Sequence, residues 1–266
     1  MKHRFSLYQT IIWLGLKSKL TYRLSSFLDM TGRLIEFLGW ILIWTALLGA
    51  GTRFGTSMKE MTTYLIITRL VITLTASTAG NEISRKIRDG SIAMDFIRPL
   101  NFKGFLFCND IGNNLFKAFA VFLPIGVITA LGFGFLPPQS PAHFLSFLSA
   151  LLLGAVLQFY YDYLLGLLSF WLLQNPFLNW HFRNVANLFA GQFMPIWLYP
   201  ASLATVTLFL PFRYFTYEPI ALYLGKSPLA ELPRILLTQL IWLAVLYLIE
   251  RLVWRSARRK LIIQGG

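Results

Sequence analysis

Four ionisable side chains stand well inside long apolar stretches of the sequence. They are Glu36, Arg69, Lys117 and Asp162. A charged group near the centre of a membrane helix costs about 3 kcal/mol, so it usually pairs with another charge or faces water or a substrate. We therefore expect these four residues to line a translocation path or to form pairs between membrane helices.

The surroundings of these charges suggest particular partners. Arg33 lies three residues before Glu36 on the same helix face, which favours an ion pair over a role in substrate binding. Asp162 lies among tyrosines and would suit a cationic or sugar-bearing substrate. A bond to a neighbouring helix, with Lys117 as the candidate partner, is the interpretation that we favour. Arg69 would serve either a cavity between two subunits or a lipid phosphate.

No catalytic motif accompanies these groups. The sequence has no phosphate loop of the form GxxxxGKS or GxxxxGKT, no GxSxG elbow and no HExxH motif. Its three histidines and single cysteine, Cys108, are too scattered for a metal site or an internal disulfide. We expect neither an enzyme nor a bound metal. An intramembrane lipid-modifying enzyme stays an alternative only through the isolated carboxylates.

The elements that must hold these residues are membrane helices. Of the 266 residues, 56% are hydrophobic and 13% are charged, whereas soluble domains have about 25% charged residues. Apolar stretches of about 20 residues, the length that crosses a bilayer, predict one all-α integral membrane domain over 1–266 with six transmembrane helices. The predicted spans are 34–50, 61–80, 111–136, 144–173, 185–210 and 234–254.

The basic residues predict the orientation of these spans. The formal net charge is +13, but the cations lie between apolar stretches, so membrane lipid and not nucleic acid is the expected contact. Sixteen Lys and Arg residues outside the spans lie on the side of the two termini and four on the other side. The positive-inside rule then places both termini, including the tail 255–266, on the cytoplasmic side of the cell membrane.

Residues 1–33 precede the first span and carry an apolar stripe flanked by basic residues. The stripe has a spacing of three or four residues from Phe5 to Leu20. This pattern favours an amphipathic helix in the cytoplasmic interface over a solvated basic leader.

The cytoplasmic loop 81–104 has two short amphipathic segments joined at Gly90. Ile83 and Ile87 share one helical face before Gly90, and a second apolar stripe that includes Ile92 follows it. A short helix with this pattern is suited to docking in a groove of another protein. A basic loop that only contacts lipid headgroups is the alternative.

The same loop carries a family resemblance. The run Ile87-Arg-Asp-Gly-Ser-Ile-Ala-Met-Asp-Phe-Ile-Arg-Pro-Leu100 resembles a segment of type-2 ABC transporter permeases, in the six-helix branch without a fused ATPase domain. Phe96 stands where leucine is usual in that branch. Further similarities follow in the same order along almost the whole chain. They are Tyr22-Arg23, Lys59–Tyr64, Leu210–Arg213, Glu218-Pro219, Leu224–Lys226 and Gln264–Gly266.

The resemblance implies an exporter permease that pairs with a second permease subunit, identical or homologous, and with two cytoplasmic ATPase subunits. ATP and Mg²⁺ would be bound by those ATPases, and no cofactor would be bound by this chain directly. The loop 81–104 would be the coupling helix. The residues implied for coupling are Glu82, Arg85, Arg88, Asp89, Gly90, Ile92 and Phe96.

The segment 211–233 is rich in proline and aromatic residues, and by resemblance it would form short external re-entrant helices over the translocation path. An ATP-independent channel or secondary transporter is the alternative function. Such a protein would show inverted repeats or paired broken helices, and no clear internal repeat is visible in the sequence.

Overall fold

The computed structural model describes residues 8–16, 23–49, 55–97, 101–171 and 177–264, and every regular element in these ranges is helical. The all-α prediction is confirmed. After a helix over residues 8–16, the elements are α2 (Arg23–Gly49), α3 (Met58–Thr75), α4 (Ala79–Arg88), α5 (Ile92–Ile97), α6 (Phe102–Lys117), η1 (Ala118–Phe122), α7 (Leu123–Phe133), α8 (Pro141–Leu168), α9 (Phe177–Phe189), η2 (Ile196–Leu198), α10 (Ala201–Leu208), η3 (Phe212–Tyr214), α11 (Tyr217–Tyr223), η4 (Leu229–Glu231) and α12 (Leu232–Gln264).

Four helical stretches within the described ranges are long and apolar enough to cross a membrane. They are Thr31–Gly49, Phe102–Phe133, Pro141–Leu168 and Leu229–Ala257. A fifth crossing is present if α3 and α4, which meet at an angle of 41°, count as one bent span. These stretches overlap five of the predicted spans, but a count of six is not confirmed.

The second predicted span, 61–80, is interrupted by a bend that hydropathy did not reveal. Side chains of α6 satisfy the backbone groups that the interruption exposes. Asp110 accepts hydrogen bonds from the backbone N–H of Thr78 at 3.2 Å and from the Ser77 hydroxyl at 2.9 Å. The Asn114 amide donates to the carbonyl oxygens of Leu74 and Ala76. A helix can break at membrane depth only where neighbouring groups replace its lost hydrogen bonds, as they do here.

The fifth predicted span, 185–210, is wrong as a continuous helix. The chain leaves helical conformation after α9, where Gly191 has a φ of +73°. Pro195 and Pro200 then prevent a regular helix from continuing, because proline lacks an N–H donor and clashes with the preceding turn. The resulting helices α9 and α10 have 13 and 8 residues, each short of the about 20 that a span requires.

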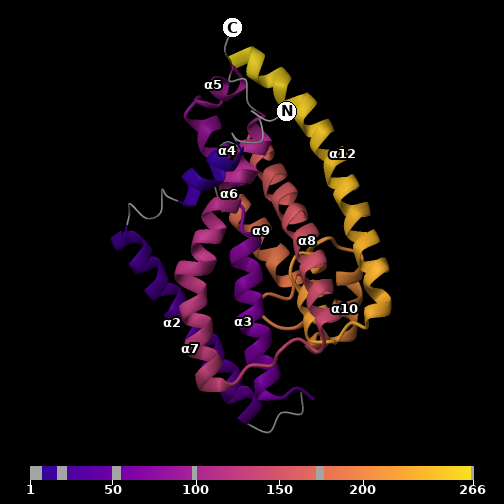
Figure 1. Cartoon of the computed structure of the whole chain (residues 1–266). Coiled ribbons are helices and arrows are strands. Elements are labelled where there is room, and N and C mark those ends of the chain that lie inside the picture. Colours follow the sequence, from indigo (N-terminus) through magenta and orange to yellow (C-terminus); the bar gives the residue numbers. More distant parts are fainter. Residues whose placement is uncertain (1–7, 17–22, 50–54, 98–100, 172–176, 265–266) are drawn as a thin grey trace.

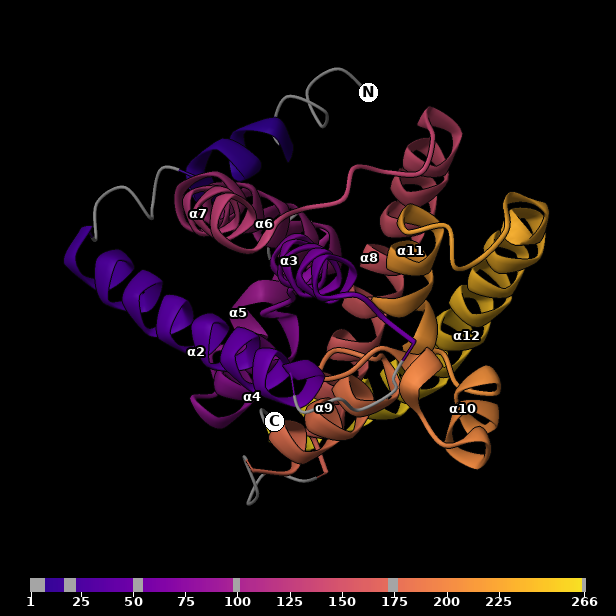
Figure 2. The same ribbon diagram turned by 90° about the horizontal axis from the view of Figure 1, so that it is seen from below.

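Helix α8 is the centre of the bundle and contacts α3, α4, α11 and α12. Helices α4 and α5 and the last turns of α12 lie at the same end of the molecule (Figure 1). Seen along the bundle, α3 lies between α2 and α8 (Figure 2). Within 211–233 the predicted short helices are present as η3, α11 and η4, and α11 is buried against α8. Their re-entry into the membrane stays a prediction.

The predicted interfacial helix is described over residues 8–16 and packs across α6. A Cβ atom on Gly112 would lie 2.2 Å from the carbonyl oxygen of Ile12, so the two backbones are in contact. Trp13 and Leu14 on the other face are more than half exposed, as an interfacial helix requires. Residues 1–7 and 17–22 of the predicted segment lie outside the described ranges, and 23–33 form the start of α2.

Candidate functional site: the α4–α5 hairpin and the buried ion pairs

The first half of the predicted coupling loop is α4, which is fixed to α8 by a close backbone contact. A Cβ atom on Gly80 would lie 2.5 Å from the carbonyl oxygen of Asp162. One turn further along, Ile83 is fully buried and the hydroxyls of Ser84 and Ser169 are 2.5 Å apart. Glycine and serine allow this approach because they have little or no side chain between the helix axes. Helix α4 is therefore packed directly against the backbone of α8.

Gly90 forms the turn between α4 and α5. Its φ of +70° is the left-handed conformation that glycine adopts without strain, and a Cβ atom there would meet nothing within 4 Å. On the far side of the turn, Ile92 is 2% exposed and packs in the same apolar cluster as Ile83. Burial of Ile92 in this cluster thus holds α5 against the rest of the bundle. Phe96 lies in α5, but its side chain is outside the described part of the structure.

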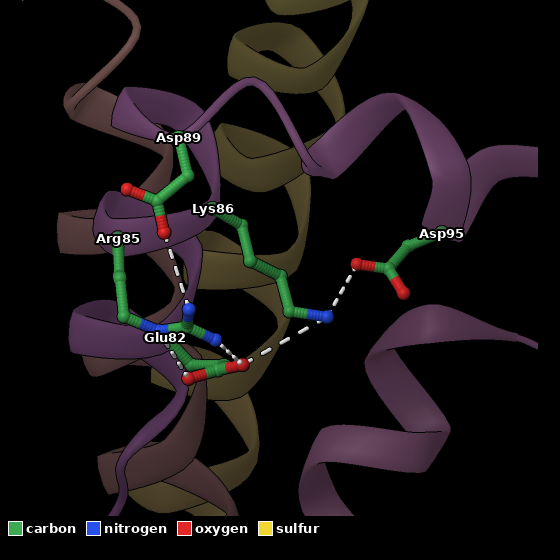
Figure 3. A network of polar contacts seen from close by, with 5 residues as sticks. All are labelled: Glu82, Arg85, Lys86, Asp89 and Asp95. Atoms are coloured by element: carbon green, nitrogen blue, oxygen red, sulfur yellow. Dashed lines mark hydrogen bonds and ion pairs between the residues drawn. The ribbon is translucent and has the colours of Figure 1, made fainter.

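An ion-pair network of five residues runs along α4 and across to α5 (Figure 3). The Arg85 guanidinium lies 2.7 Å from Glu82 of the same helix and 3.2 Å from Asp89, the residue that follows α4. Lys86 reaches across the turn to Asp95 on α5 at 2.5 Å and lies 3.8 Å from Glu82. The Lys86 and Asp95 side chains are mostly buried, so this bond fixes the relative position of the two short helices. The exposed Arg85 pairs contribute little to stability.

The exposed tip of the hairpin is a mixed charged and apolar surface. Arg85, Arg88, Asp89 and Gly90 are exposed, as their predicted contact role requires. Met94 is 63% exposed beside them, and the sequence interpretation missed it. Its position two residues after the buried Ile92, on the opposite side of a helix, is the signal that would have identified it. A flexible methionine at the edge of a charged surface is suited to a protein contact.

Lys103 connects the end of the hairpin to the last helix, although the sequence indicated only a cytoplasmic cation. Its ammonium group lies 3.1 Å from Glu250 on α12. The rings of Tyr160, Tyr163 and Tyr247 surround it, with centroids 4.8, 5.7 and 5.6 Å away. A cation is attracted to the faces of aromatic rings, most strongly where water is excluded. This Lys103 cage joins α6, α8 and α12 beneath the hairpin.

Three of the four intramembrane charges, Glu36, Arg69 and Asp162, form interhelical pairs. Asp162 is buried on α8 and accepts a hydrogen bond from Arg183 of α9 at 2.8 Å. Asp162 thus bonds to a neighbouring helix, with Arg183 as the partner where the sequence favoured Lys117. Glu36 on α2 lies 2.8 Å from Arg69 on α3. Arg33 lines the same pocket as this pair, and its predicted bond to Glu36 stays a prediction.

Within the described ranges, no group of three or more His, Cys, Asp or Glu residues lies close enough together to hold a metal ion. The acidic side chains are instead committed to cations or to helix ends. Asp110 caps the α3–α4 bend, and Glu218 receives hydrogen bonds from Arg213 and Ser227 in the segment between α10 and α12. The charged side chains of the described residues thus hold helices and helix ends together.

A bundle of long apolar helices, with ion pairs inside it and a charged hairpin at one end, defines the chain as a multi-pass membrane protein. The family described as ABC-2 family transporter protein matches residues 32–265, so the chain belongs to that family. The resemblance to type-2 ABC permeases is confirmed, and the chain is the membrane component of a transporter. None of the curated proteins compared with the chain matches it.

Proposed function

We propose that this chain is the permease subunit of an ATP-driven exporter and receives its driving force from a separate ATPase through the α4–α5 hairpin, residues 79–97. One observation carries the proposal. The hairpin has a fixed inner face, formed by Gly80, Ile83 and Ile92, and an exposed charged tip around Gly90. A lever needs both a rigid attachment and a free contact surface.

The contacts behind the hairpin distribute a push on its tip over three helices. Gly80 transfers it to α8 through the backbone contact at Asp162. Lys103 transfers it to α12 through Glu250, and Asp110 joins the α3–α4 bend to α6. Packed elements shift as units and do not deform gradually, so closure of an ATPase dimer against the tip would tilt these helices together and switch access to the path.

A second permease subunit is part of the proposal, and α2 supports it. This helix is largely unburied and presents large apolar side chains outward. They are Ile35, Leu38, Leu42, Ile43 and Leu47. The same helix contributes Glu36 to the ion pair with Arg69, so a charged pair lies beside an exposed apolar face. A translocation path between two subunits would give that pair access to water.

The test combines the full chain with a candidate phosphate-loop ATPase from an adjacent reading frame; the two are co-expressed, purified and reconstituted in nanodiscs. We expect the two to co-purify and the permease to alter the rate of ATP hydrolysis. Gly90→Val should abolish that effect, because a β-branched residue is strained at a φ of +70° and distorts the tip. Met94→Glu should weaken ATPase binding about tenfold and leave the thermal midpoint of the permease unchanged.

A matched control is available at Gly55. It has a φ of +62° and nothing within 4 Å of a Cβ position, as at Gly90, but it lies just before α3 at the opposite end of that helix from the hairpin. Gly55→Val should therefore cost similar backbone strain without loss of coupling. Equal loss of coupling in both glycine variants, or normal coupling in Gly90→Val and Met94→Glu, would count against the hairpin as the contact site.

A further inference from the structure

A cavity of about 390 Å³ lies between α6 and α8, over the bend that joins α3 to α4. Sites for small ligands have volumes of about 300 to 1,000 Å³ and are mostly apolar. The walls of this cavity are apolar on both helices and include Ile111, Leu152 and Val156. The rings of Phe107 and Phe159 meet edge to face with centroids 4.9 Å apart and close the cavity toward the hairpin. We call this cavity the bend pocket.

The bend pocket lies at the depth of the lipid hydrocarbon. Its wall on α8, residues 151–159, begins ten residues after the start of α8 and ends nine residues before its end. Helix α8 has 28 residues and is long enough to cross the bilayer, so this wall lies near the middle of the membrane. Leu152 in the wall is 70% exposed. A molecule dissolved in the lipid can therefore reach the pocket directly.

A buried carboxylate forms part of the floor of the bend pocket. Both oxygens of Asp110 act as acceptors, for the Ser77 hydroxyl and for the backbone N–H and hydroxyl of Thr78. Asp110 is 4% exposed, and among the described residues it has no ion-pair partner. Lys117, seven positions along the same helix, acts on it electrostatically and does not line the pocket. A carboxylate at this depth usually faces a cation, water or a ligand.

Asn114, one turn further along α6, adds a second acceptor to the floor. Its amide nitrogen donates to the carbonyl oxygens of Leu74 and Ala76 at 3.1 and 2.6 Å, so its oxygen Oδ1 is directed away from them. Oδ1 has no hydrogen-bond partner in the described part of the chain, although Asn114 is only 6% exposed. Buried polar atoms normally have a partner. The hydroxyl of Thr75 lines the same pocket and likewise has none among the described residues.

We propose that the bend pocket binds an amphipathic amine, a molecule with a compact apolar body and a protonated amino group. The apolar walls hold the body, and the ammonium group donates to Asp110, Asn114 and Thr75. An ammonium group has three donors and no acceptor, which matches a floor that offers acceptors. Asp110 repels an anion, and a wholly apolar molecule leaves Oδ1 of Asn114 without a partner. The inference goes beyond the proposed function and needs no ATPase.

The test uses the purified full chain without its ATPase and three probes with the same apolar cage. Adamantanamine is a cation at neutral pH, as alkylamines are, whereas adamantanol is neutral and adamantanecarboxylate is an anion. Isothermal titration calorimetry measures their affinities. We expect saturable binding of the amine, about tenfold weaker binding of the alcohol and no binding of the carboxylate. Equal affinities for the amine and the alcohol would overturn the cation site.

A change in the wall tests where the amine binds. Ala155→Phe fills part of the pocket without removing any polar group, so it should weaken amine binding at least about tenfold. The matched control is Ala244→Phe, at an exposed alanine of α12 that does not line the pocket, and it should leave the affinity unchanged. Unchanged affinity in Ala155→Phe, or an equal loss in both variants, would overturn the site.

Changes in the floor test which atoms recognise the amine. Asp110→Asn keeps the size of the side chain and removes its charge, so the amine should lose its advantage over the alcohol. Thr75→Val removes a hydroxyl without breaking a hydrogen bond of the described structure and should weaken amine binding about threefold. A retained preference for the amine in Asp110→Asn would overturn the role of the carboxylate. If that variant does not fold, the comparison of the three probes on the unchanged protein decides the same question.

Discussion

Gly80 on α4 and Gly166 on α8 lie in backbone contact, since a Cβ atom on Gly166 would lie only 2.8 Å from the Cα atom of Gly80. The contact is a consequence of residue size, because any larger residue at either position would separate the helices. It joins the hairpin to the central helix of the bundle. This small interface can be tested without knowledge of the substrate.

We expect Gly80→Ala to destabilise the protein by about 2 kcal/mol, because the added methyl group would meet the Asp162 carbonyl oxygen at 2.5 Å and backbone must shift to admit it. The thermal midpoint in detergent measures the loss. Gly39→Ala is the matched control, a helical glycine on α2 with nothing within 4 Å of the Cβ position. That change should be neutral or stabilise by up to about 1 kcal/mol. Equal effects of the two variants would contradict the close contact.

We expect Asp162→Asn to cost about 3 kcal/mol, because Arg183 would then lie partly buried without its counter-charge. Arg183→Gln should cost nearly as much, and the double variant should lose clearly less than the sum of the two, as residues in direct contact do. Thermal unfolding of the unchanged protein, the two single variants and the double variant gives the interaction energy between Asp162 and Arg183. The Lys226–Glu60 pair is more exposed, so Lys226→Gln should cost about 1 kcal/mol or less. Strict additivity at Asp162 and Arg183 would show that the pair is not formed.

The orientation predicted from the basic residues can be measured with single cysteines in a Cys108→Ser background. Met94→Cys places a thiol on the exposed tip of the hairpin, and Ala230→Cys places one on the exposed turn before α12. A maleimide that does not cross membranes should label the Ala230 variant in intact cells and the Met94 variant only in inverted vesicles. The reverse pattern would place the hairpin outside the cytoplasm and would exclude it as an ATPase contact.

Local pattern was sufficient to predict the hairpin. The spacing of Ile83 and Ile87, the glycine at position 90 and the second stripe that begins at Ile92 are short-range signals, and the structure contains both short helices and the left-handed turn between them. The presence of helices within the long apolar stretches was also predictable, because it too depends on short-range sequence signals. Hydropathy averages over a window, however, and is insensitive to a break.

The breaks in the predicted spans and the partners of the buried charges depend on contacts between residues that are far apart in the sequence. The bend after Thr75 is stabilised by Asp110 and Asn114 of another helix, and nothing in the local sequence specifies that contact. Likewise, Arg183 follows Asp162 by 21 positions, and only the fold brings its guanidinium to 2.8 Å from that carboxylate. Charge complementarity predicted that Asp162 would have a partner but could not select which cation.

The Lys103 cage has a consequence for how the protein is made. Lys103 is synthesised in the first half of the chain, but Glu250 and Tyr247 belong to α12, the last helix. Until α12 is inserted, the hairpin has neither its ionic anchor nor one wall of the aromatic cage, although the α4–α8 contact can already form. A chain that ends before α12 would therefore lack the contacts that hold the hairpin to the last helix. Completion of the final helix would thus be the step that fixes the hairpin against the rest of the bundle.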